Sequence, residues 1–143
     1  MPIAMDADAL NAFLSQVFQQ VADDFHVDHV GDGEVTMRLL TSDKHLRPGG
    51  TISGPSMFGL ADVAAYVVTL SQIGPVALAV TTNCSIDFMR KPEAGVPLIA
   101  TARLLKLGKQ LSVSDVLLFS EGKEAPVARA SLTYAIPPAK ELS

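Results

Sequence analysis

The sequence predicts an α+β fold in which an antiparallel sheet of about five to six strands curls around one apolar helix. Two observations carry this prediction. Residues 54–70 are apolar around nearly the whole circumference of a helix, which requires protein on most sides of it. Several segments on either side of this run alternate apolar and polar residues and are separated by short turns, as antiparallel strands are. A further helix is predicted at the N-terminus.

Residues 1–24 form an N-terminal helical segment in this prediction. Between Leu10 and Val21 the apolar residues recur at the i, i+3, i+4 and i+7 spacing of an amphipathic helix. Asp6 or Asp8 would cap its first turn, because a carboxylate accepts hydrogen bonds from the free N–H groups there. One face of this helix should pack on the rest of the domain.

A β-hairpin is predicted after this helix. The alternating segments Phe25–Val30 and Glu34–Leu40 are separated by Gly31-Asp32-Gly33, a turn sequence typical of hairpins. Residues 41–51 are rich in Gly, Pro, Ser and Asp, which indicates a loop. This loop leads into the apolar helix.

One carboxylate interrupts the apolar helix. Pro55 suits the first helical turn, with Ser53 or Gly54 as the cap. Asp62 is the only Asp, Glu, Lys, Arg or His between Ser53 and Leu70. Removing a carboxylate from water is costly unless a partner compensates for the lost hydration. The protein therefore either pairs Asp62 internally, as a structural carboxylate, or uses it in chemistry.

The strands after the helix are predicted as follows. The clearest pattern covers Ala77–Met89 and has an apolar and a polar face, formed respectively by Leu78, Val80, Thr82, Cys84, Ile86 and Phe88 and by Thr81, Asn83, Ser85 and Asp87. Three more strands joined by short turns form a meander, namely Leu98–Leu107, Gln110–Phe119 and Val127–Ala135. The apolar residues of the middle one change phase, which predicts a bulge near Asp115 or burial of both faces. Residues 136–143 are expected to form a flexible tail.

Composition restricts the class of function. The 143 residues fit a single domain, carry a net charge of −4 and have no Lys/Arg cluster beyond Arg90-Lys91, so no nucleic-acid partner is expected. No metal site is expected, because His26 and His29 have no further ligand at suitable spacing. The lone Cys84 and the absence of a signal-peptide pattern favour a cytoplasmic location. The high mean hydropathy of +0.31 favours a homo-oligomer.

No membrane partner is expected either, because the apolar run is of borderline length, opens with Gly-Pro and contains a carboxylate.

Several sequence features occur together in a characteristic order. They are the Gly-Pro-x-x-x-x-Leu-Ala-Asp start of the central helix, the strand end Ser85–Pro92, and the hairpin from Ala100-Thr101-Ala102 to Gly108-Lys109-Gln110. From about Val35 to Val116 the chain resembles hotdog-fold acyl-CoA thioesterases, in particular the phenylacetate-pathway (PaaI-type) branch. The resemblance implies an acyl-CoA substrate and a homodimer whose sheets join edge to edge, often doubled to a tetramer. It also implies active sites at the subunit boundary.

The resemblance assigns roles to individual residues. Asp62 falls on the catalytic acid of that family, and Gly54 falls on the glycine whose N–H polarises the thioester carbonyl. Thr81 falls near a serine or threonine that helps to hold the attacking water in some members. Three positions depart from the family pattern: Ser53 replaces a histidine, Pro55 replaces a second glycine, and Arg47 occupies the position of an asparagine.

Further residues are candidates for substrate binding. His45 and Arg47, in the loop before the helix, either reach the thioester or are ordinary loop residues. Arg90 and Lys91 sit at a strand end, where cations can meet coenzyme A phosphates or remain solvated. The other candidates lie on or beside the helix and are Ser53, Pro55, Met57, Phe58 and Tyr66. Tyr66, one turn after Asp62, either bonds to it, lines the acyl pocket or packs in the core.

The expected activity is hydrolysis of acyl-CoA to a free acid and coenzyme A, with no cofactor beyond the coenzyme A of the substrate. Asp62 would act as a general base or as a nucleophile, and the sequence leaves both open. Two alternatives retain the fold. One is a non-catalytic module that binds acyl-CoA or another ligand; the other is an enoyl-thioester hydratase or dehydratase that uses His45 with an acid.

Overall fold

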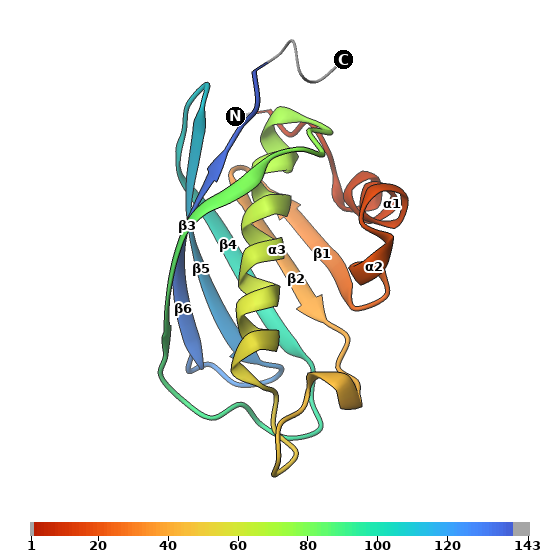
Figure 1. Cartoon of the computed structure of the whole chain (residues 1–143), viewed down its shortest axis with the longest axis vertical. Helices are drawn as coiled ribbons and strands as arrows, with labels where there is room; N and C mark the ends of the chain where they lie inside the picture. Colours follow the sequence, from red (N-terminus) through yellow and green to blue (C-terminus); the bar gives the residue numbers. More distant parts are fainter. Residues whose placement is uncertain (1, 139–143) are drawn as a thin grey trace.

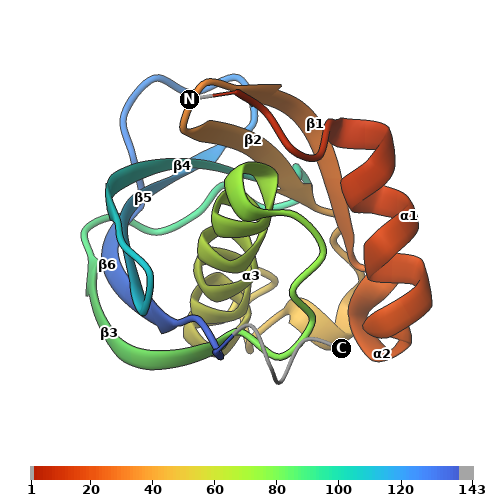
Figure 2. The same cartoon turned by 90° about the horizontal axis from the view of Figure 1, so that it is seen from above.

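The computed structural model describes residues 2–138. Six antiparallel strands form one sheet in the order β1-β2-β4-β5-β6-β3, and this sheet curls around the long helix α3 (Figures 1 and 2). Two shorter helices, α1 and α2, lie beside β1, at the edge of the sheet farthest from β3 in strand order. The predicted α+β arrangement of a curled sheet around one apolar helix is therefore confirmed.

The N-terminal segment contains two helices where the sequence predicted one. α1 covers Ala7–Val17 and ends at Phe18, whose φ of −131° is not helical. α2 is a single turn, Gln19–Ala22. Of the two predicted N-caps, Asp6 is the one used, because its side chain accepts the N–H of Ala9. The interruption leaves Phe18 at the junction of the two helices.

The predicted hairpin is present as β1 (Phe25–Gly31) and β2 (Glu34–Leu39). Its two-residue loop is Asp32-Gly33, and Gly33 has a φ of +70°, which a glycine adopts without steric cost. The loop that follows contains one 3-10 turn, η1 (Asp43–His45).

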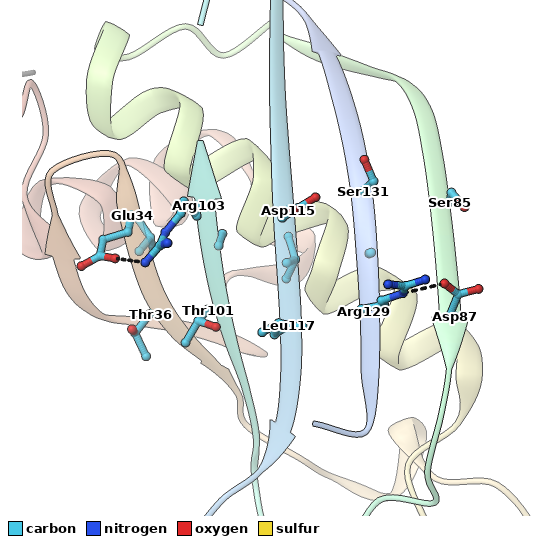
Figure 3. A pocket seen from close by; sticks show the side chains of 14 residues that line it. Glu34, Thr36, Ser85, Asp87, Thr101, Arg103, Asp115, Leu117, Arg129 and Ser131 are labelled. Carbon is cyan, nitrogen blue, oxygen red and sulfur yellow. Dashed lines mark hydrogen bonds and ion pairs between the residues drawn. The ribbon is translucent and has the colours of Figure 1, made fainter. Parts of the chain in front are cut away.

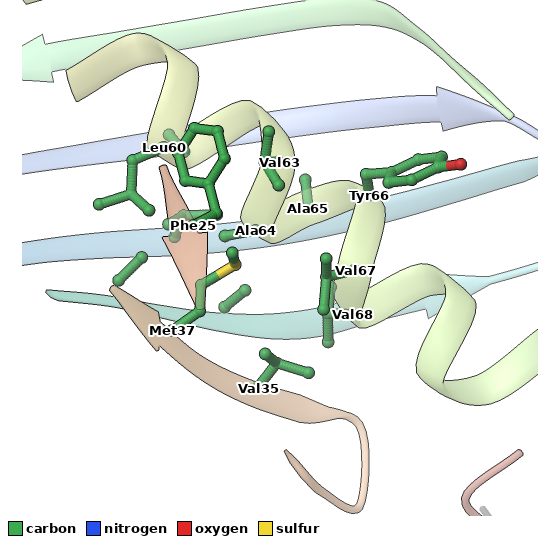
Figure 4. Close-up of a cluster of buried hydrophobic side chains, with 14 of the residues drawn as sticks. Phe25, Val35, Met37, Leu60, Val63, Ala64, Ala65, Tyr66, Val67 and Val68 are labelled. Carbon is green, nitrogen blue, oxygen red and sulfur yellow. The ribbon is translucent and has the colours of Figure 1, made fainter. Parts of the chain in front are cut away.

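α3 covers Gly54–Ile73 and begins as predicted. Ser53 is the N-cap, and its Oγ accepts the N–H of Ser56 at 3.3 Å. α3 has the length and apolar composition of a membrane span, but 67% of its apolar window is buried inside this fold. Its side chains pack against the strands around it, and Figure 4 shows part of this core between α3 and the hairpin.

The strand after α3 differs from its prediction in length and in facing. β3 covers Val80–Phe88 and pairs only with β6 (Ala128–Ala135), so its other edge is free within the described residues 2–138. The register between these strands shifts between Thr81 and Asn83. This bulge changes the phase of the side chains, so that Thr81 faces inward together with Cys84 and not opposite to it. The predicted uninterrupted alternation is wrong at this point.

The last three strands form the predicted meander of β4 (Leu98–Leu107), β5 (Leu111–Ser120) and β6. β5 alternates regularly, with its buried face formed by Ser112, Ser114, Val116, Leu118 and Ser120. The bulge predicted near Asp115 is absent from β5, and the register shift lies instead in β4, between Leu104 and Lys106. Burial of both faces is also wrong, because Leu111 and Leu117 on the other face are exposed. Of the predicted tail, residues 139–143 lie outside the described residues.

A side-chain amide fastens α1 to the sheet. Asn11 accepts the N–H of Val27 through Oδ1 at 2.9 Å and donates Nδ2–H to the carbonyl of the same residue at 3.0 Å. The amide thus takes the place that a neighbouring strand would have on this side of β1. It also determines where the end of α1 and Phe18 lie.

We expect Asn11→Ala to lower the free energy of unfolding by about 1–3 kcal/mol, because the change leaves a backbone N–H and C=O of β1 without partners. Urea unfolding followed by circular dichroism measures this difference. Gln16→Ala is the matched control, because Gln16 is exposed on the same helix, and it should change the value by less than about 0.5 kcal/mol. Equal effects of the two substitutions would contradict the role assigned to Asn11.

Candidate functional site

The Asp62 carboxylate is paired on one oxygen only. Oδ1 accepts a hydrogen bond from Thr81 Oγ1 at 2.5 Å and another from the Tyr134 hydroxyl at 2.8 Å. Oδ2 has no hydrogen-bond partner within residues 2–138. Two neutral hydroxyl donors compensate part of the cost of removing the carboxylate from water and leave its second oxygen available.

Tyr134 comes from β6 and is almost fully buried. Its hydroxyl also lies 2.9 Å from the backbone carbonyl oxygen of Asp62, which accepts from it. Burial, and next the negative charge of Asp62, raise the pKa of the Tyr134 phenol far above its usual value. The phenol therefore stays protonated and acts as a hydrogen-bond donor.

A cavity of about 450 Å³ opens beside Asp62. It lies between the α1–α2 junction and the start of β3, with α3 forming its floor, and it is lined by Val17, Phe18, Gln20, Asp62, Val63, Tyr66, Ala77, Ala79, Val80, Thr81 and Tyr134. Three of its rings form a chain: Phe18 meets Tyr66 edge to face at 6.4 Å between centroids, and Tyr66 lies 5.9 Å from Tyr134. Apart from Asp62 no lining residue is an Asp, Glu, Lys, Arg or His, so the cavity suits a largely apolar group beside one carboxyl group.

The start of α3 offers a different chemical group. Of the first N–H groups of the helix, that of Ser56 bonds to Ser53 Oγ, that of Met57 bonds to Ser53 O, and Pro55 has none. The Gly54 N–H has no acceptor within the described residues. It lies at the positive end of the helix dipole and is free to bind an oxygen atom that carries negative charge.

Gly54 and Asp62 do not meet within one chain. Eight residues separate them on α3, which is about 12 Å along the helix axis. A methyl group on Gly54 would lie 3.6 Å from Phe88 at the end of β3, whereas Asp62 contacts Thr81 near the start of that strand. Each chain therefore presents an acid at one end of β3 and a free N–H at the other.

The remaining predicted residues divide between these two ends. Tyr66 lines the Asp62 cavity, but its hydroxyl donates to the carbonyl of Ala77 at 3.0 Å and makes no bond to Asp62. Burial raises the pKa of the Tyr66 phenol. The residues near the start of α3 comprise the cap Ser53, Pro55, the exposed Phe58 and the buried Met57.

The predicted cations lie outside the cavity. Arg47 is exposed in the turn before α3, and Arg90 and Lys91 lie two and three residues after the end of β3. Arg90 donates to the carbonyl of Pro126 at 2.7 Å. All three cations thus lie on the side of the molecule where α3 begins. Arg47 is joined to Ser53 by a short loop, and Arg90 and Lys91 follow Phe88, which lies against Gly54.

His45 does not reach the cavity. Its ring is buried, Nδ1 accepts the N–H of Ser42 at 2.9 Å, and Nε2 lies 3.6 Å from an oxygen of Asp24. The contact with Ser42 belongs to the capping box of η1. Within one chain the structure therefore separates His45 from Asp62.

Sequence reasoning missed Tyr134 and Phe18 as residues of this site. A signal for Tyr134 was present, because it shares the inward phase of its strand with Leu132 and Ala130, where a buried hydroxyl needs a partner. No comparable signal existed for Phe18, because its position depends on the break between α1 and α2.

A second cavity, of about 620 Å³, lies on the outer face of the sheet (Figure 3). Its wall contains two ion pairs, Arg103 with Glu34 and Arg129 with Asp87. It lies across the sheet from α3 and contains none of the residues around Asp62.

Groups that bind metals are not brought together in the described part of the chain, where no cluster of three or more His, Cys, Asp or Glu side chains occurs. Cys84 is half-buried against the core, and burial raises the pKa of its thiol, which disfavours the reactive thiolate.

Comparison with solved structures supports the fold and the family. A protein of Silicibacter sp. TM1040 described as a candidate thioesterase is 59% identical, with a TM-score of 0.90 and 96% of each chain covered. A Streptococcus mutans UA159 protein solved bound to acetyl-CoA is 26% identical, with a TM-score of 0.68 and coverage of 80% of this chain and 89% of that one.

The sequence comparisons agree with this result. The acyl-coenzyme A thioesterase PaaI of Escherichia coli (strain K12) is 32% identical over 91 residues, which cover 63% of this chain and 62% of that protein. The match thus spans less than two thirds of that relative. The family profile of the thioesterase superfamily matches residues 49–127, which include the whole of α3 and β3. Because this match covers more than half of the chain, the protein belongs to the thioesterase superfamily.

Proposed function

We propose that this protein hydrolyses acyl-CoA thioesters to a free acid and coenzyme A. The observation that carries the proposal is the Asp62 carboxylate, which is held on one oxygen by two hydroxyl groups and exposes the other beside an apolar cavity. Membership of the thioesterase superfamily and the acetyl-CoA bound to the Streptococcus mutans relative support the same substrate class. Hydrolysis of a thioester by water requires no metal or redox cofactor.

In the proposed mechanism Asp62 acts on the thioester carbon. As a general base it takes a proton from water, which attacks the carbonyl, or it attacks directly and forms a mixed anhydride. In either case the carbonyl oxygen gains negative charge as the new C–O bond forms. The Gly54 N–H is suited to bind that oxygen, because it has no other acceptor and lies at a helix N-terminus.

The C–S bond then breaks and coenzyme A leaves as a thiolate, which in the general-base route takes the proton held by Asp62. In the nucleophilic route the thiolate takes a proton from water, and a water molecule then hydrolyses the mixed anhydride to the free acid and restores Asp62.

A single chain does not supply both groups to one carbonyl, because they lie two turns apart on α3. The proposed solution is a homodimer in which the free edges of two β3 strands pair antiparallel. A twofold axis near Cys84 and Ser85 then brings Thr81 opposite Phe88 of the partner subunit, and with it Asp62 near Gly54 of the partner subunit. Exposed apolar side chains near this edge support the pairing, namely Leu78, Val80, Phe88 and Met89, together with Phe58 on α3.

The remaining site residues follow from this arrangement. Arg90 and Lys91 are exposed just beyond β3 and are proposed to bind the phosphates of coenzyme A. Phe58, Tyr66 and the N-terminal Phe18 are proposed to contact the acyl group. Arg47 occupies the turn before Gly54 and is proposed to contact the thioester end of the substrate.

The hydratase alternative needs a histidine beside an acid in the cleft. No histidine lines the Asp62 cavity, and the His45 ring is occupied by the η1 capping box. The structure offers no specific observation in favour of this alternative.

We expect Asp62→Asn to lower kcat for acyl-CoA hydrolysis by about 10²–10⁴-fold, because an amide is neither a base nor a nucleophile. The amide oxygen can still accept from Thr81 and Tyr134, so the fold should be retained. Release of free coenzyme A from a panel of acyl-CoAs, measured with a thiol reagent, gives the rates.

Glu34→Gln is the matched control for this substitution. Glu34 is an exposed carboxylate on the outer face of β2, away from the proposed interface, and lies 3.5 Å from Arg103. Its loss should leave turnover within about twofold, as is usual for an exposed ion pair. Equal turnover by wild type and Asp62→Asn would refute the mechanism, and tight acyl-CoA binding without turnover by the wild type would identify a binding module.

The shared site makes a second prediction. Asp62→Asn and Gly54→Pro, which removes the N–H, should each be inactive alone and should complement each other in mixed dimers. Random mixing gives half mixed dimers, each with one intact site, so we expect about a quarter of wild-type activity. Two affinity tags isolate the mixed species, and circular dichroism checks that each variant is folded. Inactive mixed dimers made from folded chains would show that Asp62 and Gly54 do not act across the boundary.

A further inference from the structure

The two donors to Asp62 converge from neighbouring strands. Thr81 of β3 and Tyr134 of β6 are direct partners in the register of the sheet, and both hydroxyl groups point at the same carboxylate oxygen. The bulge between Thr81 and Asn83 is what turns Thr81 toward this oxygen. Two adjacent strands therefore hold one oxygen of a carboxylate that is carried by α3.

We propose that Tyr134 is a positioning residue which, together with Thr81, fixes the Asp62 carboxylate through Oδ1 so that Oδ2 is the reacting oxygen. This inference rests on the proposed thioesterase function, and it identifies Oδ2 as the atom that acts in the first step of the proposed hydrolysis. In this proposal Tyr134 acts only through Asp62 and does not contact the substrate.

An aspartate carboxylate needs partners that hold it because its side chain rotates easily. Rotation about the last torsion of an aspartate is soft, so a carboxylate bound by nothing presents either oxygen over a broad range of angles. Two donors on Oδ1 remove this freedom and leave the lone pairs of Oδ2 facing the cavity. A general base or a nucleophile reacts fastest when it is already held in the reactive orientation.

Tyr134 is itself held in place. Its ring is buried and lies against Tyr66 at a centroid distance of 5.9 Å. Its single hydroxyl proton is shared between Asp62 Oδ1 and the backbone carbonyl of the same residue. The second contact fixes the hydroxyl relative to the backbone of α3, so its position does not depend on the rotamer of Asp62.

A purely structural role for Tyr134 makes a different prediction. The backbone carbonyl of Asp62 alone satisfies a buried phenol, and loss of that bond would affect stability without affecting the chemical step. The positioning role requires a loss of kcat that exceeds any change in KM, because the substrate is bound elsewhere in the cavity.

The test compares Tyr134→Phe, Thr81→Val and the double variant with wild type, using the acyl-CoA that the wild type hydrolyses best. We expect each single variant to lower kcat by about ten- to a hundredfold with KM changed less than about threefold. The double variant should lose less than the product of the two losses, because both hydroxyl groups act on one oxygen. Thr81→Ser keeps a hydroxyl and should restore most of the activity that Thr81→Val loses.

Ser131→Ala is the matched control. It removes a hydroxyl from β6, the strand that carries Tyr134, at an exposed position on the outer face of the sheet. Its kcat should equal that of wild type. The thermal midpoint of every variant is recorded so that a loss of folded protein is not mistaken for a loss of kcat.

The outcomes separate this inference from the function on which it rests. Unchanged kcat in Tyr134→Phe, with Asp62→Asn inactive, overturns the positioning role and leaves the thioesterase proposal standing. A wild type that hydrolyses no acyl-CoA overturns both. If Tyr134→Phe does not fold, the two Thr81 variants decide. Equal kcat values for Thr81→Val and Thr81→Ser overturn the proposal that hydroxyl donors on Oδ1 position Asp62. A lower kcat in Thr81→Val alone supports it.

Discussion

The structure depends on how a carboxylate is accommodated on a helix that is otherwise apolar. α3 is enclosed by the sheet, and Asp62 lies partly buried on it without any cation that would pair with it among the described residues. Neutral hydroxyl donors hold the carboxylate in place of a salt bridge. A cation would neutralise the charge of the carboxylate, whereas two hydroxyl groups on one oxygen orient the carboxylate and leave the other oxygen without a partner among the described residues, as the proposed role of Asp62 requires. The same two hydrogen bonds that lower the cost of burying Asp62 thus also orient its carboxylate for the proposed reaction.

The fold was predictable because its main signals are local. The all-round apolar pattern of α3, its Ser53 cap and the alternation of the β4 to β6 meander depend on neighbouring residues, and all three are observed. Errors arose where tertiary contacts override the pattern. The buried face of β5 carries three serines, one of which bonds to Thr69 of α3. Because serines are polar, the pattern of apolar residues did not reveal this face and wrongly predicted a bulge. The break at Phe18 likewise occurs inside an uninterrupted amphipathic pattern.

The candidate site was predictable only in part, for a geometric reason. Asp62 was identifiable because a lone charge in an apolar run needs an explanation, and Gly54 because the family resemblance places it on the glycine whose N–H polarises the thioester carbonyl. The partners of Asp62 come from strands 19 and 72 residues further along the chain. One of them, Thr81, faces Asp62 only because of a β-bulge, and strict alternation pointed it the other way. A one-residue change of register has this effect at any strand, so the contact depends on the assembled sheet.

The spacing of Asp62 and Gly54 links the site to the free edge of the sheet. A helix places residues eight positions apart about 12 Å distant along its axis, which is too far for both to act on one carbonyl group. The two groups lie at opposite ends of β3, since Thr81 contacts Asp62 and Phe88 lies against Gly54. When two β3 edges pair antiparallel, as proposed, the two subunits run in opposite directions along the interface. Asp62 of one subunit then lies near Gly54 of the other. An exposed strand edge is a liability for aggregation in a single chain, whereas in the proposed homodimer the edge of β3 is the element that brings Asp62 and Gly54 of different subunits together.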